Sequence, residues 1–80
     1  SRKPLGTVVK IQVRQESAQP AVEGVLTRQV KEWKLSGSTR DAGGMATLEY
    51  HVRLRKSIPA DAVARELRSL GPQIANVEAE

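Results

Sequence analysis

The sequence has no cysteine, which excludes disulfide bonds, thiol nucleophiles and metal sites built on thiolates. It also has no phenylalanine, and only one tryptophan and one tyrosine, so its core must be aliphatic and few rings are available for stacking. No apolar run approaches the roughly 18 residues that a membrane-spanning helix needs, and the start lacks the layout of a signal peptide. We therefore expect the chain by itself to be soluble.

Charge of one sign does not dominate any stretch of the chain. The 13 basic and 9 acidic residues give a net charge of +4, and the two kinds are interspersed. A basic balance suits an anionic partner such as nucleic acid, phosphate or the acidic inner leaflet of a membrane, whereas interspersed charges suit ordinary solvation. Composition leaves both interpretations open.

The chain begins with SRKPLG, a basic cluster before a proline, and no initiator methionine precedes it. This beginning indicates that the 80 residues are one small domain excised from a longer protein. Lys and Arg at this position suit a segment that flanks a membrane helix on its cytoplasmic side.

Hydrophobic periodicity predicts six elements. Alternation of apolar and polar residues predicts four strands, over residues 7–14, 34–39, 47–56 and 74–79. Apolar spacings of three and four predict two helices, over residues 21–33 and 57–70. The order strand, helix, strand, strand, helix, strand predicts an α+β, ferredoxin-like βαββαβ fold, in which both helices cover one face of a four-stranded antiparallel sheet.

Single residues mark the ends of these elements. Pro20 suits the start of the first helix, where a proline loses no hydrogen bond. Trp33 is expected to fill the core at the end of that helix. Ser57 is expected near the cap of the second helix, and Gly71 and Pro72 end it, because glycine accepts the left-handed conformation and proline cannot continue a helix.

The pattern also predicts which side chains point toward the core and which point toward solvent. The stretch TLEYHVRLRK alternates almost without fault, and its apolar row is expected against the helices: Leu48, Tyr50, Val52 and Leu54. Glu23 is expected on the outer side of the first helix. In the strand over residues 34–39, Leu35 is expected to point inward and Ser36 and Ser38 outward.

The first and third strands are central in this topology, so their polar side chains are expected to be neighbours on the open face of the sheet. This predicted interaction face has seven residues: Lys10, Gln12, Arg14, Glu49, His51, Arg53 and Arg55. Its mixed charges favour association with a protein partner or a second copy, through this face or an edge strand. Plain solvation is the competing interpretation, and His51 has the further alternatives of a pH-sensitive group or an anion ligand.

The sequence does not meet the requirements of RNA recognition, metal binding, catalysis or phosphate binding. RNA recognition on this topology needs aromatic rings at outward positions of the central strands, which hold none, although charge could attract a nucleic-acid backbone without specificity. The carboxylates are scattered with no Asp-x-Asp pair, and His51 has no identifiable triad partners. The segment QESAQPAVE has no glycine with which to cradle a phosphate. We therefore expect no enzyme, no metal site and no cofactor.

Three segments carry a family resemblance: SRKPLG leading to TVVKIQV, the long strand ATLEYHVRLRK after a polar hairpin, and IPADAVARELRSLGPQIANVEAE. Together they resemble the ACT-like C-terminal domains appended to bacterial membrane proteins, above all those of the MgtC/SapB family. The resemblance implies a regulatory or interaction domain at the cytoplasmic face of the bacterial inner membrane. It further implies a parent protein linked to adaptation to magnesium limitation or to transport.

Three functions stay open on this basis. The first is a non-catalytic interaction or dimerisation module of the membrane protein. The second is a small-ligand regulatory domain, because ACT domains bind amino acids near the loop after the first strand, where this chain has RQESAQP. The third is a module that binds nucleic acid or anions without specificity.

Overall fold

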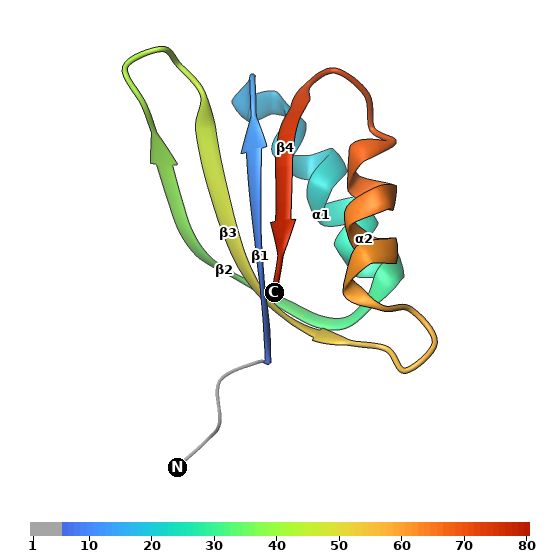
Figure 1. The fold of residues 1–80 in the computed structure, drawn as a ribbon. Coiled ribbons are helices and arrows are strands. Elements are labelled where there is room, and N and C mark those ends of the chain that lie inside the picture. The colour runs from blue at the N-terminus through green and yellow to red at the C-terminus, as the bar shows by residue number, and fades with distance from the viewer. Residues whose placement is uncertain (1–5) are drawn as a thin grey trace.

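The computed structural model describes residues 6–80, so the predicted membrane-flanking segment at residues 1–5 lies outside the described part. The elements follow in this order: β1 (Thr7–Val13), the 3₁₀ turn η1 (Glu16–Ala18), α1 (Gln19–Gln29), β2 (Val30–Arg40), β3 (Ala46–Leu54), α2 (Ala60–Arg68) and β4 (Ile74–Ala79). The strands form one antiparallel sheet in the order β2-β3-β1-β4, with both helices on one face (Figure 1). The predicted ferredoxin-like α+β fold is confirmed.

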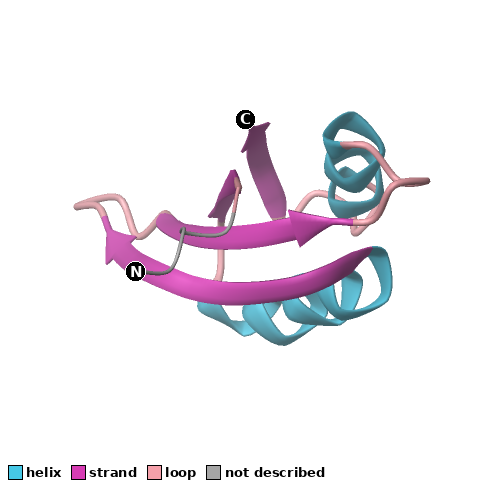
Figure 2. Ribbon diagram, turned by 90° about the horizontal axis from the view of Figure 1, so that it is seen from below, coloured by secondary structure: helices cyan, strands magenta, loops and turns pink. Residues whose placement is uncertain are grey.

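The core lies between the sheet and the helices. It is formed by apolar side chains that are at most 5% exposed, contributed by β1, β3, α1, α2 and single positions of the other elements: Val9, Ile11, Val13, Ala18, Val22, Val25, Leu26, Val30, Ala46, Leu48, Tyr50, Val52, Val63, Ala64, Leu67 and Val77. Tyr50 is the one aromatic ring among them, as the composition predicts. Burying a Val, Leu or Ile side chain contributes roughly 1.5–3 kcal/mol, so this layer supplies most of the stability. Figure 2 shows that the long strands of the sheet are curved.

The boundary between α1 and β2 differs from the prediction. The helix ends at Gln29, and Val30 takes an extended backbone with φ −118° and ψ 161°. The prediction of helix over residues 30–33 was wrong because Val30 and Trp33 also fit the helical spacing of three. Their pairing with β3 decides the conformation, since Trp33 lies opposite Val52. Trp33 is half-buried against the core, from a strand rather than from a helix end.

β2 is therefore an edge strand of 11 residues, longer than predicted, and it contains two irregularities. Its register with β3 shifts between Val30 and Glu32 and again between Leu35 and Gly37. The second shift puts Ser38 opposite Leu48, on the helix side of the sheet, so the prediction that Ser38 points outward was wrong. A bulge inserts an extra residue and reverses the faces that follow, which simple alternation does not capture.

α2 is shorter than predicted because Pro59, and not Ser57, is its N-cap. Ser57 lies in the turn that precedes the helix. α2 ends at Arg68, two residues before the predicted end. The stop at Gly71 agrees with the sequence, because Gly71 has φ +106°, a left-handed conformation that glycine adopts without strain, and Pro72 follows it. No helix within residues 6–80 is long and apolar enough to cross a membrane.

Candidate docking surface on the open face of the sheet

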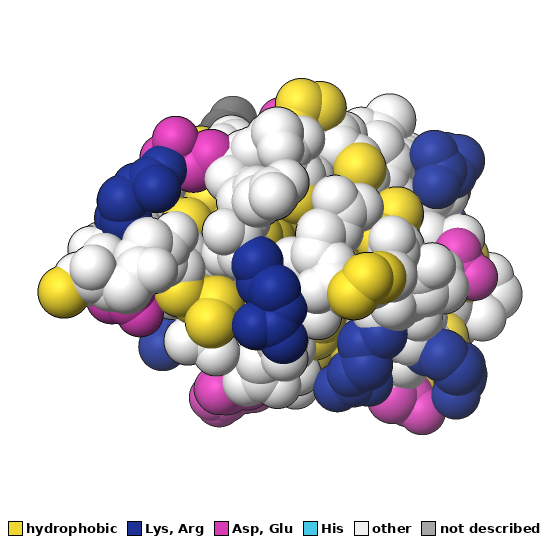
Figure 3. Space-filling view, turned by 90° about the horizontal axis from the view of Figure 1, so that it is seen from above, with side chains coloured by type: hydrophobic (Ala, Val, Ile, Leu, Met, Phe, Trp, Pro, Cys, Tyr) yellow, Lys and Arg dark blue, Asp and Glu magenta, His cyan; other side chains and the backbone are white. Residues whose placement is uncertain are grey.

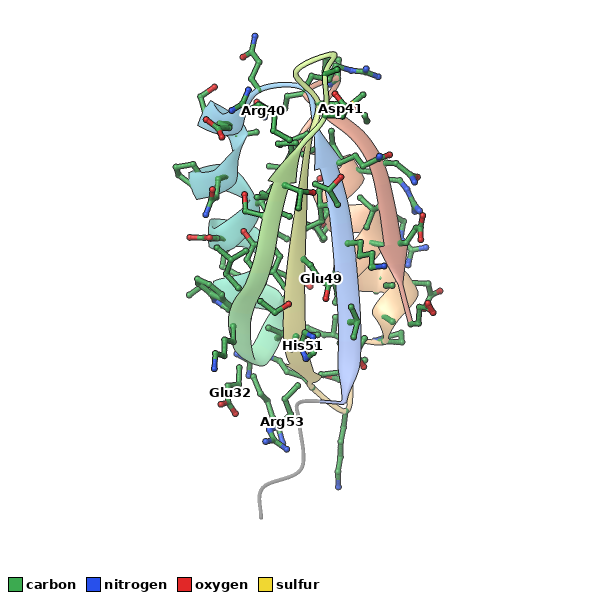
Figure 4. All side chains as sticks on the ribbon, turned by 90° about the vertical axis from the view of Figure 1, so that its left-hand side faces the viewer. Glu32, Arg40, Asp41, Glu49, His51 and Arg53 are labelled. Carbon is green, nitrogen blue, oxygen red and sulfur yellow. The ribbon has the colours of Figure 1, made fainter. Side chains whose placement is uncertain are left out.

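We use "open face" for the side of the sheet that turns away from α1 and α2, which Figure 4 shows from the front. The two central strands, β1 and β3, form the middle of the open face. Lys10 lies opposite Glu49, and Gln12 lies opposite Thr47. Opposite residues of an antiparallel pair point to the same side, so the predicted polar neighbours do share one surface.

Glu49 lies at the centre of this surface and has contacts from three strands. The ammonium of Lys10, on β1, is 3.9 Å from Glu49 Oε1. On β3 itself, His51 Nε2 is 3.7 Å from Glu49 Oε2. On β2, the hydroxyl of Ser36 donates to the backbone oxygen of Glu49 at 3.2 Å and lies 3.4 Å from Oε2. We call these four residues the Glu49 cluster.

The Glu49 cluster remains accessible to solvent. The side chains of Lys10, Glu49 and His51 are 53%, 37% and 31% exposed. Ion pairs at such exposure contribute about 0–1 kcal/mol, because water screens them and their side chains lose entropy on pairing. The cluster therefore adds little to the stability of the fold, and its charges stay available to a partner.

A second ion pair lies at the end of the face where β2 begins. Arg53 Nε lies 3.2 Å from Glu32 Oε1 across the β2–β3 ladder, and both side chains are 57% exposed. Figure 4 shows the two side chains together below His51. The carboxylate of Glu32 offsets the charge of Arg53. This end of the open face is therefore less basic than the outward side chains of β3 would make it by themselves.

Two predicted members of the interaction face lie beyond the central strands. Arg14 follows the end of β1, and its Nε donates to the backbone oxygen of Pro72 at 2.9 Å. Its side chain thus holds the turn between α2 and β4. Arg55 follows the end of β3, and its backbone oxygen accepts from Ile58 in the turn before α2. β1 ends one residue earlier and β3 two residues earlier than the alternation predicts, so both arginines lie just outside the paired strands that carry the Glu49 cluster.

The edge strands add charged residues that the sequence analysis did not assign to the open face. On β2, Lys34 lies opposite His51. On β4, Glu78 lies opposite Lys10, and Glu80, just after β4, exchanges backbone hydrogen bonds with Val8. The alternation of residues 74–79 could have identified Glu78. Lys34 begins the strand predicted over residues 34–39, so the inward position of Leu35 could have identified Lys34 as well.

The aromatic side chains lie on the helix side. Trp33 and Tyr50 form an edge-to-face pair with centroids 5.7 Å apart, and the indole of Trp33 donates to Thr27. The Tyr50 hydroxyl donates to Glu23 Oε2 at 2.9 Å, which shows that the prediction of Glu23 on the outer side of α1 was wrong. Burial raises the pKa of Tyr50 well above its usual range, helped by the hydrogen bond to Glu23 and the charge of Glu23. The hydroxyl is therefore a structural donor.

Charges of both signs are mixed elsewhere too. At the end of the molecule that carries the β2–β3 loop, Lys and Arg side chains are separated by acidic and uncharged ones (Figure 3). No group of three or more His, Asp or Glu side chains in residues 6–80 is arranged to hold a metal ion. No large hydrophobic side chain within the same range is exposed. The open face is therefore a polar surface of mixed charge.

The chain matches no protein-family model, and no match is found among curated proteins. The resemblance to the MgtC/SapB family therefore remains a prediction made from the sequence.

Proposed function

We propose that this chain is a non-catalytic interaction domain that works through its open face. We further propose that it is the cytoplasmic regulatory domain of a bacterial inner-membrane protein of the MgtC/SapB type, linked to adaptation to magnesium limitation or to transport. One observation carries the proposal. The central strands β1 and β3, each paired with a neighbour on both sides, present the middle of the Glu49 cluster on the side that the helices leave open.

The physical character of the open face favours docking over the other functions. Both aromatic side chains of the chain face the helices, so base stacking on the open face has no ring to use. The charges of the face alternate in sign, which suits a protein surface with its own alternating charges better than a uniformly anionic backbone. Among the described residues, the Ser36 hydroxyl is hydrogen-bonded to Glu49 and not to His51, so Ser36, His51 and Glu49 do not form a relay in which the imidazole activates the hydroxyl.

The membrane parent is supported by the agreement between the fold and what the resemblance implies. An ACT-like domain has the βαββαβ topology, and the described residues have it as well. Exposed charged side chains such as those of the open face bind a partner weakly, which suits a domain that a membrane anchor already holds close to its partner.

The proposal is tested in the native bacterium, with the full-length protein and antibodies raised against this chain. We expect the protein to sediment with inner membranes. We also expect Glu49→Lys in the chromosomal copy to slow growth in magnesium-limited medium, with no loss of protein from the membrane. Glu66→Lys is the matched control, since it makes the same charge change on the exposed side of α2.

A protein that stays in the soluble fraction would contradict the membrane assignment. Equal growth of the Glu49→Lys and Glu66→Lys strains would contradict the working role of the open face. A titration of amide chemical shifts with amino acids and Mg²⁺ covers the small-ligand alternative, which predicts perturbation around residues 14–19 and none at the Glu49 cluster.

A further inference from the structure

We propose that the partner of the open face is a second copy of this chain, packed face to face about a two-fold axis that runs parallel to β1 and β3 and passes between them. This inference rests on the proposed docking role of the open face and specifies its partner. It follows from the order in which charged residues are arranged across the four strands.

The central row of the open face carries alternating charges. Reading across the sheet from β3 to β4, the paired positions are Glu49, Lys10 and Glu78. A two-fold axis between β3 and β1 lays β3 of one subunit over β1 of the other. Lys10 then faces Glu49 of the partner subunit, and the same contact occurs a second time by symmetry.

The neighbouring rows are compatible with the same axis. One neighbouring row begins on β2 with Lys34 and ends at the opposite edge of the sheet with Glu80. Glu80 follows β4 and is hydrogen-bonded to Val8 through the backbone. The axis brings Lys34 over Glu80 of the partner subunit, which adds another pair of opposite charges. In the other row Gln12 faces Thr47 of the partner subunit, so two uncharged polar groups meet. The central contact of the Lys34 row sets His51 over Val8 of the partner subunit, so none of the three rows places like charges opposite each other.

The other direction for the axis gives repulsion. A two-fold axis across the strands, through the central row, would lay β3 over β3 and β1 over β1. Glu49 would then face Glu49 of the partner subunit, and Lys10 would face its own counterpart. Like charges placed opposite each other disfavour association strongly. Both axes keep the strands of the two sheets aligned, as is common for sheets that meet face to face, so the charges decide between them.

The direction of β1 is consistent with attachment to one membrane. An axis parallel to the strands leaves β1 of both subunits running the same way, so both strands begin at the same end of the dimer. The proposed parent has its membrane part before β1, and two copies in one bilayer need their first strands to begin on the same side. An axis across the strands would place these ends on opposite sides.

The expected dimer is weak. The open face has no exposed large hydrophobic side chain among residues 6–80, so little apolar surface is buried and charged groups lose hydration. We expect a dissociation constant on the order of 100 µM for the isolated chain, rising with salt concentration. Confinement to a membrane raises the effective concentration enough to populate such a dimer.

Charge reversal on two residues tests the pairing by analytical ultracentrifugation. The variants are Lys10→Glu, which gives the face two acidic central residues, and Glu49→Lys, which gives it two basic ones. Each variant alone is expected to self-associate at least about tenfold more weakly than the wild type. An equimolar mixture is expected to recover dimers, because both contacts between unlike variants join opposite charges. Lys56→Glu, in the exposed turn before α2, is the control.

Mixing the two variants distinguishes contacts between chains from the Lys10–Glu49 contact within one chain. Loss of the Lys10–Glu49 pair inside a monomer cannot be repaired by adding another variant, so recovery on mixing supports the two-fold arrangement. No recovery on mixing, or undiminished dimers of both single variants, would overturn it. A monomeric wild type at about 1 mM would overturn it as well. If the Glu49→Lys bacterium still grew slowly, the docking role would stand with a different partner.

Discussion

On β3, the side chains that point toward the helices and those that point away differ sharply. Ala46, Leu48, Tyr50 and Val52 are at most 1% exposed. On the other side, the side chains of His51, Glu49 and Arg53 are 31%, 37% and 57% exposed. The inner row contributes hydrophobic burial, whereas the outer row contributes only screened contacts. One strand therefore separates the residues that maintain the fold from those free to bind, and substitutions in the two rows should have separable effects.

The largest effect is expected in the inner row, for Leu48→Ala. The substitution removes a fully buried side chain between the sheet and the helices and leaves a cavity. We expect the free energy of unfolding to fall by about 2–5 kcal/mol, measured by urea denaturation and circular dichroism. Thr47→Ala, one position away on the open face, should change it by less than about 0.5 kcal/mol. Comparable losses for the two variants would contradict the division between the rows.

Tyr50→Phe should give the next largest loss. The ring stays in the core, but the hydrogen bond from its hydroxyl to Glu23 disappears and leaves a partly buried carboxylate with Gln19 as its remaining donor. We expect a loss of about 1–2 kcal/mol in the free energy of unfolding. Ser17→Ala, which removes a long contact at an exposed turn, serves as the control. A neutral Tyr50→Phe would indicate that the hydroxyl contributes nothing.

Tyr50 also predicts a pH dependence. Its pKa is raised in the folded state, first by burial and then by its hydrogen bond to Glu23 and the charge of Glu23. The contribution of Tyr50 to the free energy of unfolding is therefore fully present below the unfolded tyrosine pKa of about 10. This contribution is lost progressively as the pH rises above that value. Because the chain has one tyrosine, ultraviolet absorbance of tyrosinate reports it alone. Tyrosinate that formed at about pH 10 without unfolding would contradict the prediction.

The pair at the end of the open face should have a smaller effect. In a double-mutant cycle with Arg53→Ala and Glu32→Ala, we expect a coupling energy of about 0.2–1 kcal/mol, because both side chains are more than half exposed. The coupling should shrink as salt is added. A coupling that persisted at high salt would indicate a more buried pair than the structure describes.

The smallest effect on stability is expected in the Glu49 cluster. Glu49→Gln keeps the size of the side chain and removes its charge, so the free energy of unfolding should change by less than about 0.5 kcal/mol. Self-association should nevertheless weaken, as measured by sedimentation. A variant that unfolded readily would show that Glu49 is needed for the fold and not for binding.

Much of the fold could be predicted from the sequence because the relevant signals are local. The alternation of Val9, Ile11 and Val13 fixes which face of β1 is buried, and Gly71 marks the end of α2 through a backbone conformation that suits glycine. The end of α1 could not be predicted, because Val30 fits both a helical stripe and a strand. Pairing with β3, a contact distant in sequence, decides between them.

The candidate site was predictable in its centre and not at its margins. Alternation in two regular strands places Lys10 and Glu49 on the open face, and the register between β1 and β3 sets them opposite each other. Arg14 and Arg55 depend on where the strands end, which is set by turns whose hydrogen bonds involve Pro72 and Ile58. Ser36 points outward as the alternation predicts, but its contact with Glu49 depends on a register shift between Leu35 and Gly37 that the alternation does not describe.

The most direct test of the docking role is a dilution series of the wild-type chain, followed by amide chemical shifts in nuclear magnetic resonance. Dilution from about 1 mM should shift the resonances of Lys10, Gln12, Glu49 and His51 together along one binding curve, while those of α1 and α2 stay constant. Shifts confined to the outer edge of β2, or no concentration dependence at all, would contradict self-association through the open face.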